Sequence, residues 1–224
     1  LAVHTGDNAA TTKRYRAEMR FLRAYSYWHA IDMFGNVPFV TEEDPVGAFF
    51  PKQISRKDLF NYVESELKEI DADLAEPHTN EYPRADKAAA WTLLAKLYLN
   101  AEVYTGTPRY TDAITYCNKI IAAGYTLEPK FGNLFLADND KITSEIIFRI
   151  AYDGIHEKTY NGTTFLIHAA VGGDMDAVND FGIDGGWYGL RTTKNIVNLF
   201  SDITGKTDSR AMFHTSGQNL EMNS

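Results

Sequence analysis

Apolar positions recur with helical spacing through the first half of the chain. Near the N-terminus they line one face every three or four residues, at Ala17, Phe21, Ala24, Trp28 and Ile31. A second face carries Leu22, Tyr25 and Met33, so we expect a helix that is buried on several sides. Gly35 and then Pro38 follow the last periodic residue, in the usual order of a helix C-cap and a breaker.

Three more segments show the same helical pattern. The first begins near Ser55, where Asp58 three positions later makes a start that resembles a capping box. Its apolar stripe consists of Leu59, Val63, Leu67, Ile70 and Leu74. The other two helices are expected to begin near Arg84 and near Tyr110, and the last of them ends at Gly124. Paired helices of this length, one of them rich in alanine, resemble tetratricopeptide units.

The pattern changes after about residue 140. Residues 145–150, EIIFRI, have the β-branched and aromatic content of a strand. Thr192 or Thr193 could cap a last helix that runs to Phe200. We therefore expect a mainly α fold in which residues 13–125 form a scaffold of helix pairs. Residues 126–224 are expected to form a loop-rich region with short strands and a terminal helix.

The composition and the charge limit the kinds of protein to which this chain can belong. Hydrophobic residues make up 44% of the 224 positions and charged residues 23%, as in ordinary globular proteins. The net charge of −8 argues against a nucleic-acid partner, which requires clustered Lys and Arg.

No apolar run is long enough to span a membrane, and no signal peptide is evident. Because the chain starts without Met on a polar stretch, we expect it to be a piece of a longer or processed protein. The single Cys117 lies in an apolar helical pattern, which predicts a buried side chain.

No pattern in the chain predicts an enzyme. Acidic residues decorate the second predicted helix at positions 64, 66, 69, 71, 73 and 76. A glycosidase needs two carboxylates that face each other across a cleft, whereas these favour a charged, solvated helix surface. The sequence also lacks a nucleophile elbow, a P-loop and a dinucleotide fingerprint. The histidines show no metal-ligand spacing.

The best candidate for a binding site is a segment in which glycines and aromatic residues alternate. It runs from Gly154 to Gly189, and its rings are Tyr160, Phe165, Phe181, Trp187 and Tyr188. Glycine allows a ligand to approach the backbone, and rings on ordered loops offer flat contact faces that suit the C–H face of a sugar. Since three of its neighbours within two residues are glycines, Trp187 is poorly placed to be wrapped by adjacent side chains. The residues alone leave one alternative open, that Trp187 fills the core from a loop.

Several separate motifs, in order from about Arg14 to Phe200, resemble the SusD-like (RagB/SusD) family. They are RAEMRFLRAYSYW, FGNVPFV, RADKAAAWTLLAKLYLNAEVYTG, LFLADND, EIIF and GGWYGLRTTKNIVNLF. Within the family, RADKAAAW, LYLNAEVYTG, FLADND and TYNGTTFL are most similar to the starch-binding member. The resemblance implies a scaffold of tetratricopeptide-like helix pairs that carries a loop-rich binding face.

The resemblance also implies a function. Members of this family are non-catalytic, outer-membrane glycan-binding lipoproteins of Bacteroidetes. They hand oligosaccharides to a SusC-like TonB-dependent transporter, and the starch-binding members use an arc of aromatic rings. Tyr160 in TYNGTTFL and Trp187 in GGWYG match two ring positions of that arc. With the adjacent Tyr188, they are the predicted glycan-binding residues, for a starch-like α-glucan.

The sequence departs from the family pattern in several places. The lipid-bearing N-terminal cysteine, an early ring-bearing segment and the C-terminal part have no counterpart here, so residues 1–224 are expected to be a partial domain. The resemblance requires no cofactor. It places a Ca²⁺ site near the ADND stretch, but the sequence is shorter just after Asp140, which leaves calcium binding open. The main alternative is a helical-repeat scaffold that binds proteins and no glycan.

Overall fold

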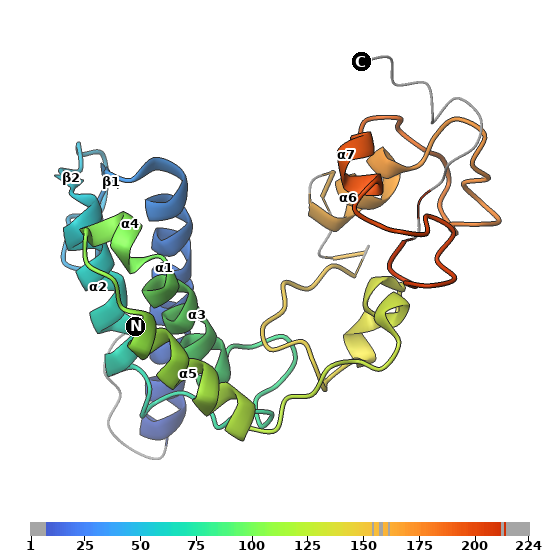
Figure 1. Cartoon of the computed structure of the whole chain (residues 1–224). Helices are drawn as coiled ribbons and strands as arrows, with labels where there is room; N and C mark the ends of the chain where they lie inside the picture. Colours follow the sequence, from blue (N-terminus) through green and yellow to red (C-terminus); the bar gives the residue numbers. More distant parts are fainter. Residues whose placement is uncertain (1–7, 154, 157–158, 161, 212, 214–224) are drawn as a thin grey trace. The chain divides into compact units, whose positions relative to one another are not determined.

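The computed structural model describes residues 8–153, 155–156, 159–160, 162–211 and 213. The chain forms two compact units (Figure 1). The first unit comprises Leu1–Leu127 and Ile142–Arg149, and the second comprises Glu128–Lys141 and Ile150–Ser224. Most of the regular structure is helical. The described residues contain only one sheet, a two-stranded antiparallel ladder.

The first unit begins with two antiparallel helices. Helix α1 spans Ala9–Phe34 and helix α2 spans Arg56–Glu69. Between them, strands β1 (Val37–Pro38) and β2 (Gln53–Ile54) pair and return the chain to the start of α2. Ser55 caps α2 by accepting a hydrogen bond from the backbone N–H of Asp58, which confirms the predicted start.

A second set of helices completes the first unit. Helices α3 (Lys87–Leu99), α4 (Ala101–Thr105) and α5 (Tyr110–Ala122) follow in the chain (Figure 1). Helix α3 begins three residues after the predicted Arg84, because the side chain of Asp86 accepts from the N–H of Ala89 and caps the helix. Eight of its 13 residues are buried, and it packs against α5 and α2. The largest fully buried side chains among the described residues lie in α1, α2 and α3 and in the turn after α2: Tyr98, Phe21, Phe60, Ile31, Leu59, Leu67, Ile70, Leu94, Leu97 and Val63.

Helix α1 is less buried than its pattern predicts. The first face is in the core, but Leu22 and Met33 on the second face are exposed, Met33 to 69%. Helices α2 and α3 and strand β1 pack against α1, and Phe148 meets Tyr25 of the second face, but Leu22 and Met33 stay exposed. The prediction of a helix buried on several sides was therefore wrong.

Cys117 also contradicts its prediction, because its side chain on α5 is exposed. Its neighbours Ile114 and Ile121 on the same helix are exposed as well, and of the residues of α5 only Ala113 is buried. The apolar pattern of α5 was read correctly as helical. It does not place Cys117 in the core, because the described elements cover only one side of α5.

We expect Cys117 to react with one equivalent of Ellman's reagent in the folded protein, because its thiol is accessible. The reaction is followed by absorbance under native conditions and again in denaturant. Equal final yields, with no loss of helical circular dichroism in the native sample, agree with an exposed thiol. Reaction only after denaturation contradicts it.

Residues 145–150 do not form the predicted strand, and with residues 142–144 they make one irregular segment. The described part of this segment has no strand partner, and the structure shows it as irregular chain. Its apolar side chains pack on the helices instead: the ring of Phe148 meets Phe21 edge-on at a centroid distance of 5.0 Å and Tyr25 at 5.7 Å. The backbone N–H of Thr126 donates to the carbonyl of Ser144 at 2.9 Å. The β-branched composition reflects burial against α1, not pairing in a sheet.

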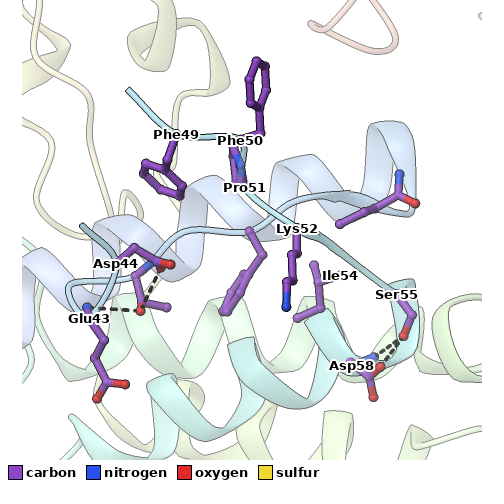
Figure 2. Close-up of a pocket in the computed structure, with 12 residues that line it drawn as sticks. Glu43, Asp44, Phe49, Phe50, Pro51, Lys52, Ile54, Ser55 and Asp58 are labelled. Carbon is purple, nitrogen blue, oxygen red and sulfur yellow. Dashed lines mark hydrogen bonds between the residues drawn. The ribbon is translucent and has the colours of Figure 1, made fainter. Parts of the chain in front are cut away.

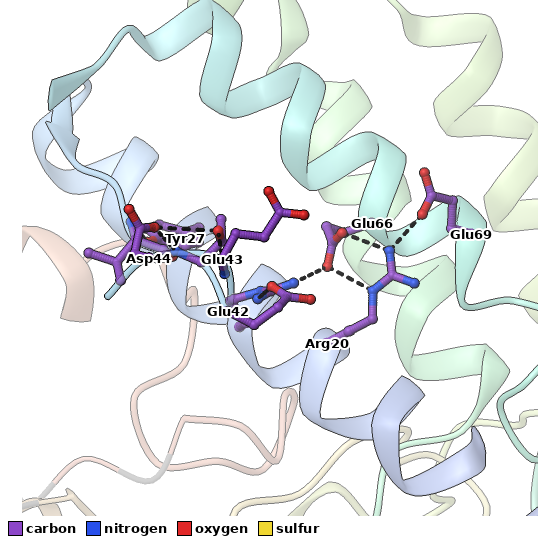
Figure 3. Close-up of polar contacts among 10 residues, drawn as sticks. Arg20, Tyr27, Glu42, Glu43, Asp44, Glu66 and Glu69 are labelled. Carbon is purple, nitrogen blue, oxygen red and sulfur yellow. Dashed lines mark hydrogen bonds and ion pairs between the residues drawn. The ribbon is translucent and has the colours of Figure 1, made fainter. Parts of the chain in front are cut away.

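The acidic residues of α2 are also not a simple solvated surface. Glu66 is only 8% exposed and binds two arginines of α1 (Figure 3). Arg20 donates to it at 2.7 and 3.0 Å, and Arg23 at 2.8 Å. Burial acts to raise the pKa of Glu66, but the hydrogen bonds from Arg20 and Arg23 outweigh it and lower that pKa. Arg23 also bonds Glu42, which lowers the pKa of Glu42 to about 2.

A second acidic group, half-buried, joins three helices. Glu64 accepts hydrogen bonds from the hydroxyl of Tyr98 on α3 at 2.8 Å and from Arg109 at the start of α5 at 3.3 Å. The interpretation of this charge run as a solvated face was therefore wrong for Glu64 and Glu66. Both carboxylates instead tie α2 to its neighbours.

The second unit contains short helices joined by long loops. They are the 3₁₀ helices η1 (Phe131–Phe135) and η2 (Asn139–Lys141) and the α-helices α6 (Gly162–Ala170) and α7 (Lys194–Val197). Thr193 precedes α7 as predicted, but its side chain makes no capping hydrogen bond and the helix ends before Phe200. Helix α6 was not predicted. Its sequence lies inside the glycine-aromatic segment that we expected to be loop.

Candidate functional site

The candidate site is built on helix α6 and the turn at residues 186–190. Trp187, Gly189 and Leu190 donate their backbone N–H groups to the carbonyls of His168 and Ala169, at 2.8 to 2.9 Å. These carbonyls lie in the last turn of α6, where no intrahelical donor remains for them. The turn therefore closes the C-terminal end of the helix, and the helix fixes the backbone of Trp187.

Two glycines make this close approach feasible. A Cβ atom on Gly186 would come within 2.2 Å of the carbonyl oxygen of Val171, and one on Gly172 within 2.6 Å of the ring of Tyr188. Both contacts are too short for any other residue without a shift of the backbone or the ring. Gly172 and Gly186 thus let the turn approach the end of α6.

The structure brings two of the three predicted residues together. The ring centroids of Tyr160 and Trp187 lie 6.4 Å apart with the planes inclined at 45°. Trp187 is 41% exposed and Tyr160 is 83% exposed, so neither ring fills the core. The core-filling alternative for Trp187 does not agree with this exposure.

The third predicted residue is placed differently. Tyr188 adopts a positive φ of 59°, and its exposed ring lies over the backbone of Gly172. Among the described residues, no ring–ring contact joins Tyr188 to Trp187 or Tyr160. Tyr188 therefore lies next to the ring pair in sequence without being part of it.

Two members of the cluster were not among the predicted glycan-binding residues: Phe165 was named only as one ring of the glycine-aromatic segment, and His168 was missed. Phe165 and His168 lie three residues apart on α6, and both meet Trp187: Phe165 at a centroid distance of 6.5 Å and His168 at 4.8 Å with an angle of only 29°. The signal was present in the glycine-free run TTFLIHAA, whose spacing places Phe165 and His168 on one helix face. We call Tyr160, Phe165, His168 and Trp187 the ring cluster.

The predicted calcium position shows only local hydrogen bonds. Asp138 pairs with Lys141 at 3.2 Å, and the amide of Asn139 donates to the carbonyl of Leu134 at 2.9 Å. Among the residues that the structure describes, no group of three or more His, Cys, Asp or Glu side chains is arranged to hold a metal ion. Calcium binding at Asp138–Asp140 stays an untested hypothesis.

A separate groove of about 680 Å³ lies in the first unit, on the segment between α1 and α2 (Figure 2). Phe39, Phe49 and Phe50 contribute rings, and Figure 2 shows the ring of Phe50 pointing away from the helices. Its polar groups largely satisfy one another: Asp44 accepts from the N–H and hydroxyl of Thr41, and Ser55 bonds Asp58. We assign no ligand to this groove.

None of the described helices has the length and hydropathy that a membrane-spanning helix requires. No family model matches the chain.

Two curated proteins are similar to the chain in sequence. The starch-binding protein SusD of Bacteroides thetaiotaomicron is 43% identical over 165 residues, which cover 72% of this chain and 29% of SusD. The SusD-like protein P25 of Formosa agariphila is 28% identical over 140 residues, or 61% of this chain and 25% of that protein. The chain thus spans less than a third of the length of the curated relatives that it matches.

Solved structures agree with the sequence relatives. A SusD-like protein from Bacteroides fragilis is 25% identical with a TM-score of 0.65, covering 87% of this chain and 36% of that protein. A SusD superfamily protein from Parabacteroides distasonis has a TM-score of 0.74 at 20% identity, over 94% of this chain and 43% of that protein, and supports the fold alone. These matches confirm the mainly α fold and the family resemblance seen in the sequence. By sequence and by fold, the chain belongs to the SusD-like family.

Proposed function

We propose that this chain is part of a non-catalytic protein that binds glycans at the cell surface. The observation that carries the proposal is the exposed ring pair of Trp187 and Tyr160: their centroids lie 6.4 Å apart, and the turn that carries Trp187 is hydrogen-bonded to α6. Flat rings in fixed positions suit the apolar face of pyranose units. The names of the relatives support the same function, since one is a starch-binding protein.

The proposed ligand is a starch-like α-glucan, and the proposed partner is a SusC-like TonB-dependent transporter that receives it. The proposed location is the outer membrane, with a lipid anchor on the full-length protein. These finer statements rest on the family resemblance and on the relative's name. They extend beyond this chain to a protein several times as long.

The expected affinity of the ring cluster is low. Each stacked ring contributes about 0.5–1.5 kcal/mol beyond the area that it buries, taking aromatic pairs as the guide. A few such rings give dissociation constants in the millimolar to micromolar range. A long polysaccharide offsets this weakness, because several copies of the protein or several sugar units can engage at once.

Replacing Trp187 by alanine is expected to abolish retardation of the protein in a native gel that contains amylopectin. The exposed indole makes no core contact, so the thermal midpoint should change by no more than about 2 °C. Phe50→Ala is the matched control, since it removes another exposed ring from a loop outside the cluster. It should migrate like the wild type in the same gel.

Other outcomes distinguish the alternatives. Unchanged retardation of Trp187→Ala contradicts the role of this ring. A wild-type protein that no α- or β-glucan gel retards favours the protein-binding scaffold instead. Release of reducing sugar from amylopectin contradicts the non-catalytic assignment.

A further inference from the structure

We propose that His168 is the positioning residue of the site: it fixes the plane of the Trp187 ring so that one indole face is presented to the glycan. The inference rests on the proposed function and adds a residue that is not among the predicted glycan-binding residues. The imidazole of His168 stacks on the indole with the centroids 4.8 Å apart and the planes 29° from parallel. It covers one face of Trp187, and the indole remains 41% exposed.

His168 is itself held in one orientation. Its Nδ1 lies 2.9 Å from the carbonyl oxygen of Thr164, one turn earlier on α6. Its Nε2 lies 3.2 Å from Oδ1 of Asp184, which is highly exposed on the loop before the turn. Both partners are acceptors, so a neutral imidazole donates to one of them and an imidazolium donates to both; in either case a donating ring nitrogen ties the imidazole plane to α6 or to Asp184.

The same residue also holds the backbone of Trp187. The carbonyl of His168 accepts the N–H of Trp187 at 2.8 Å, and the neighbouring carbonyl of Ala169 accepts from Gly189 and Leu190. Position 168 therefore restrains both the main chain and the ring of Trp187. The 41% exposure of Trp187 agrees with a ring that has one face covered and one face accessible.

The remaining rings of the cluster do not replace this support. Tyr160 and Phe165 lie 6.4 and 6.5 Å from the indole, tilted by 45° and 54°. Tilted rings at these distances do not lie flat on the indole face, whereas the imidazole of His168 does. An indole that is already oriented loses less conformational freedom when it binds a glycan. The stacking of His168 should therefore raise glycan affinity although His168 does not contact the sugar.

The test compares His168→Ala, His168→Phe and His156→Ala in the full chain. Two readouts are taken: the dissociation constant for amylopectin by affinity gel, and acrylamide quenching of Trp187 fluorescence, obtained by subtracting a Trp187→Phe sample. We expect His168→Ala to weaken binding about three- to tenfold and to increase quenching, because both indole faces become accessible. His168→Phe keeps a flat ring and should restore both readouts to near the wild-type values.

His156→Ala is the matched control. His156 forms a similar pair, with Nδ1 3.0 Å from Oδ2 of Asp153, but no ring contact joins it to Trp187 among the described residues. It should change neither readout, and the thermal midpoint confirms that every variant is folded.

The proposal is overturned if His168→Ala leaves the quenching unchanged. It is also overturned if binding falls without a change in quenching, since His168 would then contact the sugar directly. Failure of the proposed function is a different result: the wild type then binds no glucan, while the quenching experiment still reports whether His168 covers the indole.

Discussion

Phe21→Ala is expected to destabilise the first unit by about 3–5 kcal/mol, the usual cost of removing a phenyl ring from a core. Phe21 is 1% exposed and belongs to the main core cluster. Its ring also meets Phe148 edge-on at 5.0 Å, so its loss frees the segment at residues 142–149 as well as leaving a cavity. The measurement is urea denaturation followed by far-UV circular dichroism.

Met19→Ala is the control for this experiment. Met19 lies two residues away on the same helix, but its side chain is exposed, so truncation should cost less than about 1 kcal/mol. Equal losses for the two variants would show that α1 does not pack through the face that carries Phe21. If the two rings act together, the double variant Phe21→Ala/Phe148→Ala should lose less stability than the sum of the losses of the two single variants.

The helices could be predicted from the sequence because their signals are local. The stripe from Leu59 to Leu74 and the Ser55 cap lie within one segment, and the structure shows the stripe buried and the cap formed. The strand prediction at residues 145–150 was wrong because the cause of its apolar composition is not local. Ile147 and Phe148 are apolar because α1 and its neighbours cover them, and a single segment cannot reveal which element does so.

The ion pairs of the first unit could not be predicted either. Arg20 and Glu66 lie 46 positions apart, and only the antiparallel pairing of α1 with α2 brings them together. In the sequence both belong to polar stripes, which are normally solvated.

Part of the candidate site could be predicted from the sequence. Glycines on both sides of Trp187 indicated a ring not wrapped by its neighbours, and the structure shows that one of them, Gly186, also lets the turn approach Val171. The contact between Tyr160 and Trp187 depends on where α6 places the turn. The glycine-aromatic pattern of the sequence could not predict that position. His168 was missed because the helix that carries it was itself missed.

Glu66→Ala is expected to destabilise the first unit by about 2–4 kcal/mol. Removing one partner of a buried ion pair typically costs about 3–5 kcal/mol, and the lower range allows for the partial exposure of the two arginines. The truncation leaves Arg20 and Arg23 without the carboxylate that accepts three of their hydrogen bonds. Glu69→Ala is the matched control, because Glu69 also binds Arg20 from α2 at 2.6 Å but its side chain is 60% exposed. It should cost less than about 1 kcal/mol.

The same carboxylate should make stability depend on acid pH. The pKa of Glu66 is lowered in the folded state, so its ion pair contributes fully above the unfolded-state pKa of about 4.3. That contribution is lost as the pH falls through the lowered folded value, because the carboxylate must then be protonated. We expect the free energy of unfolding to fall more steeply below about pH 4.3 in the wild type than in Glu66→Gln, which has no charge to lose. Glu42, whose pKa is about 2, contributes to the fall of the unfolding free energy at acid pH in both proteins. Parallel pH profiles for the two proteins would contradict a role for the charge of Glu66 and leave only its hydrogen bonds.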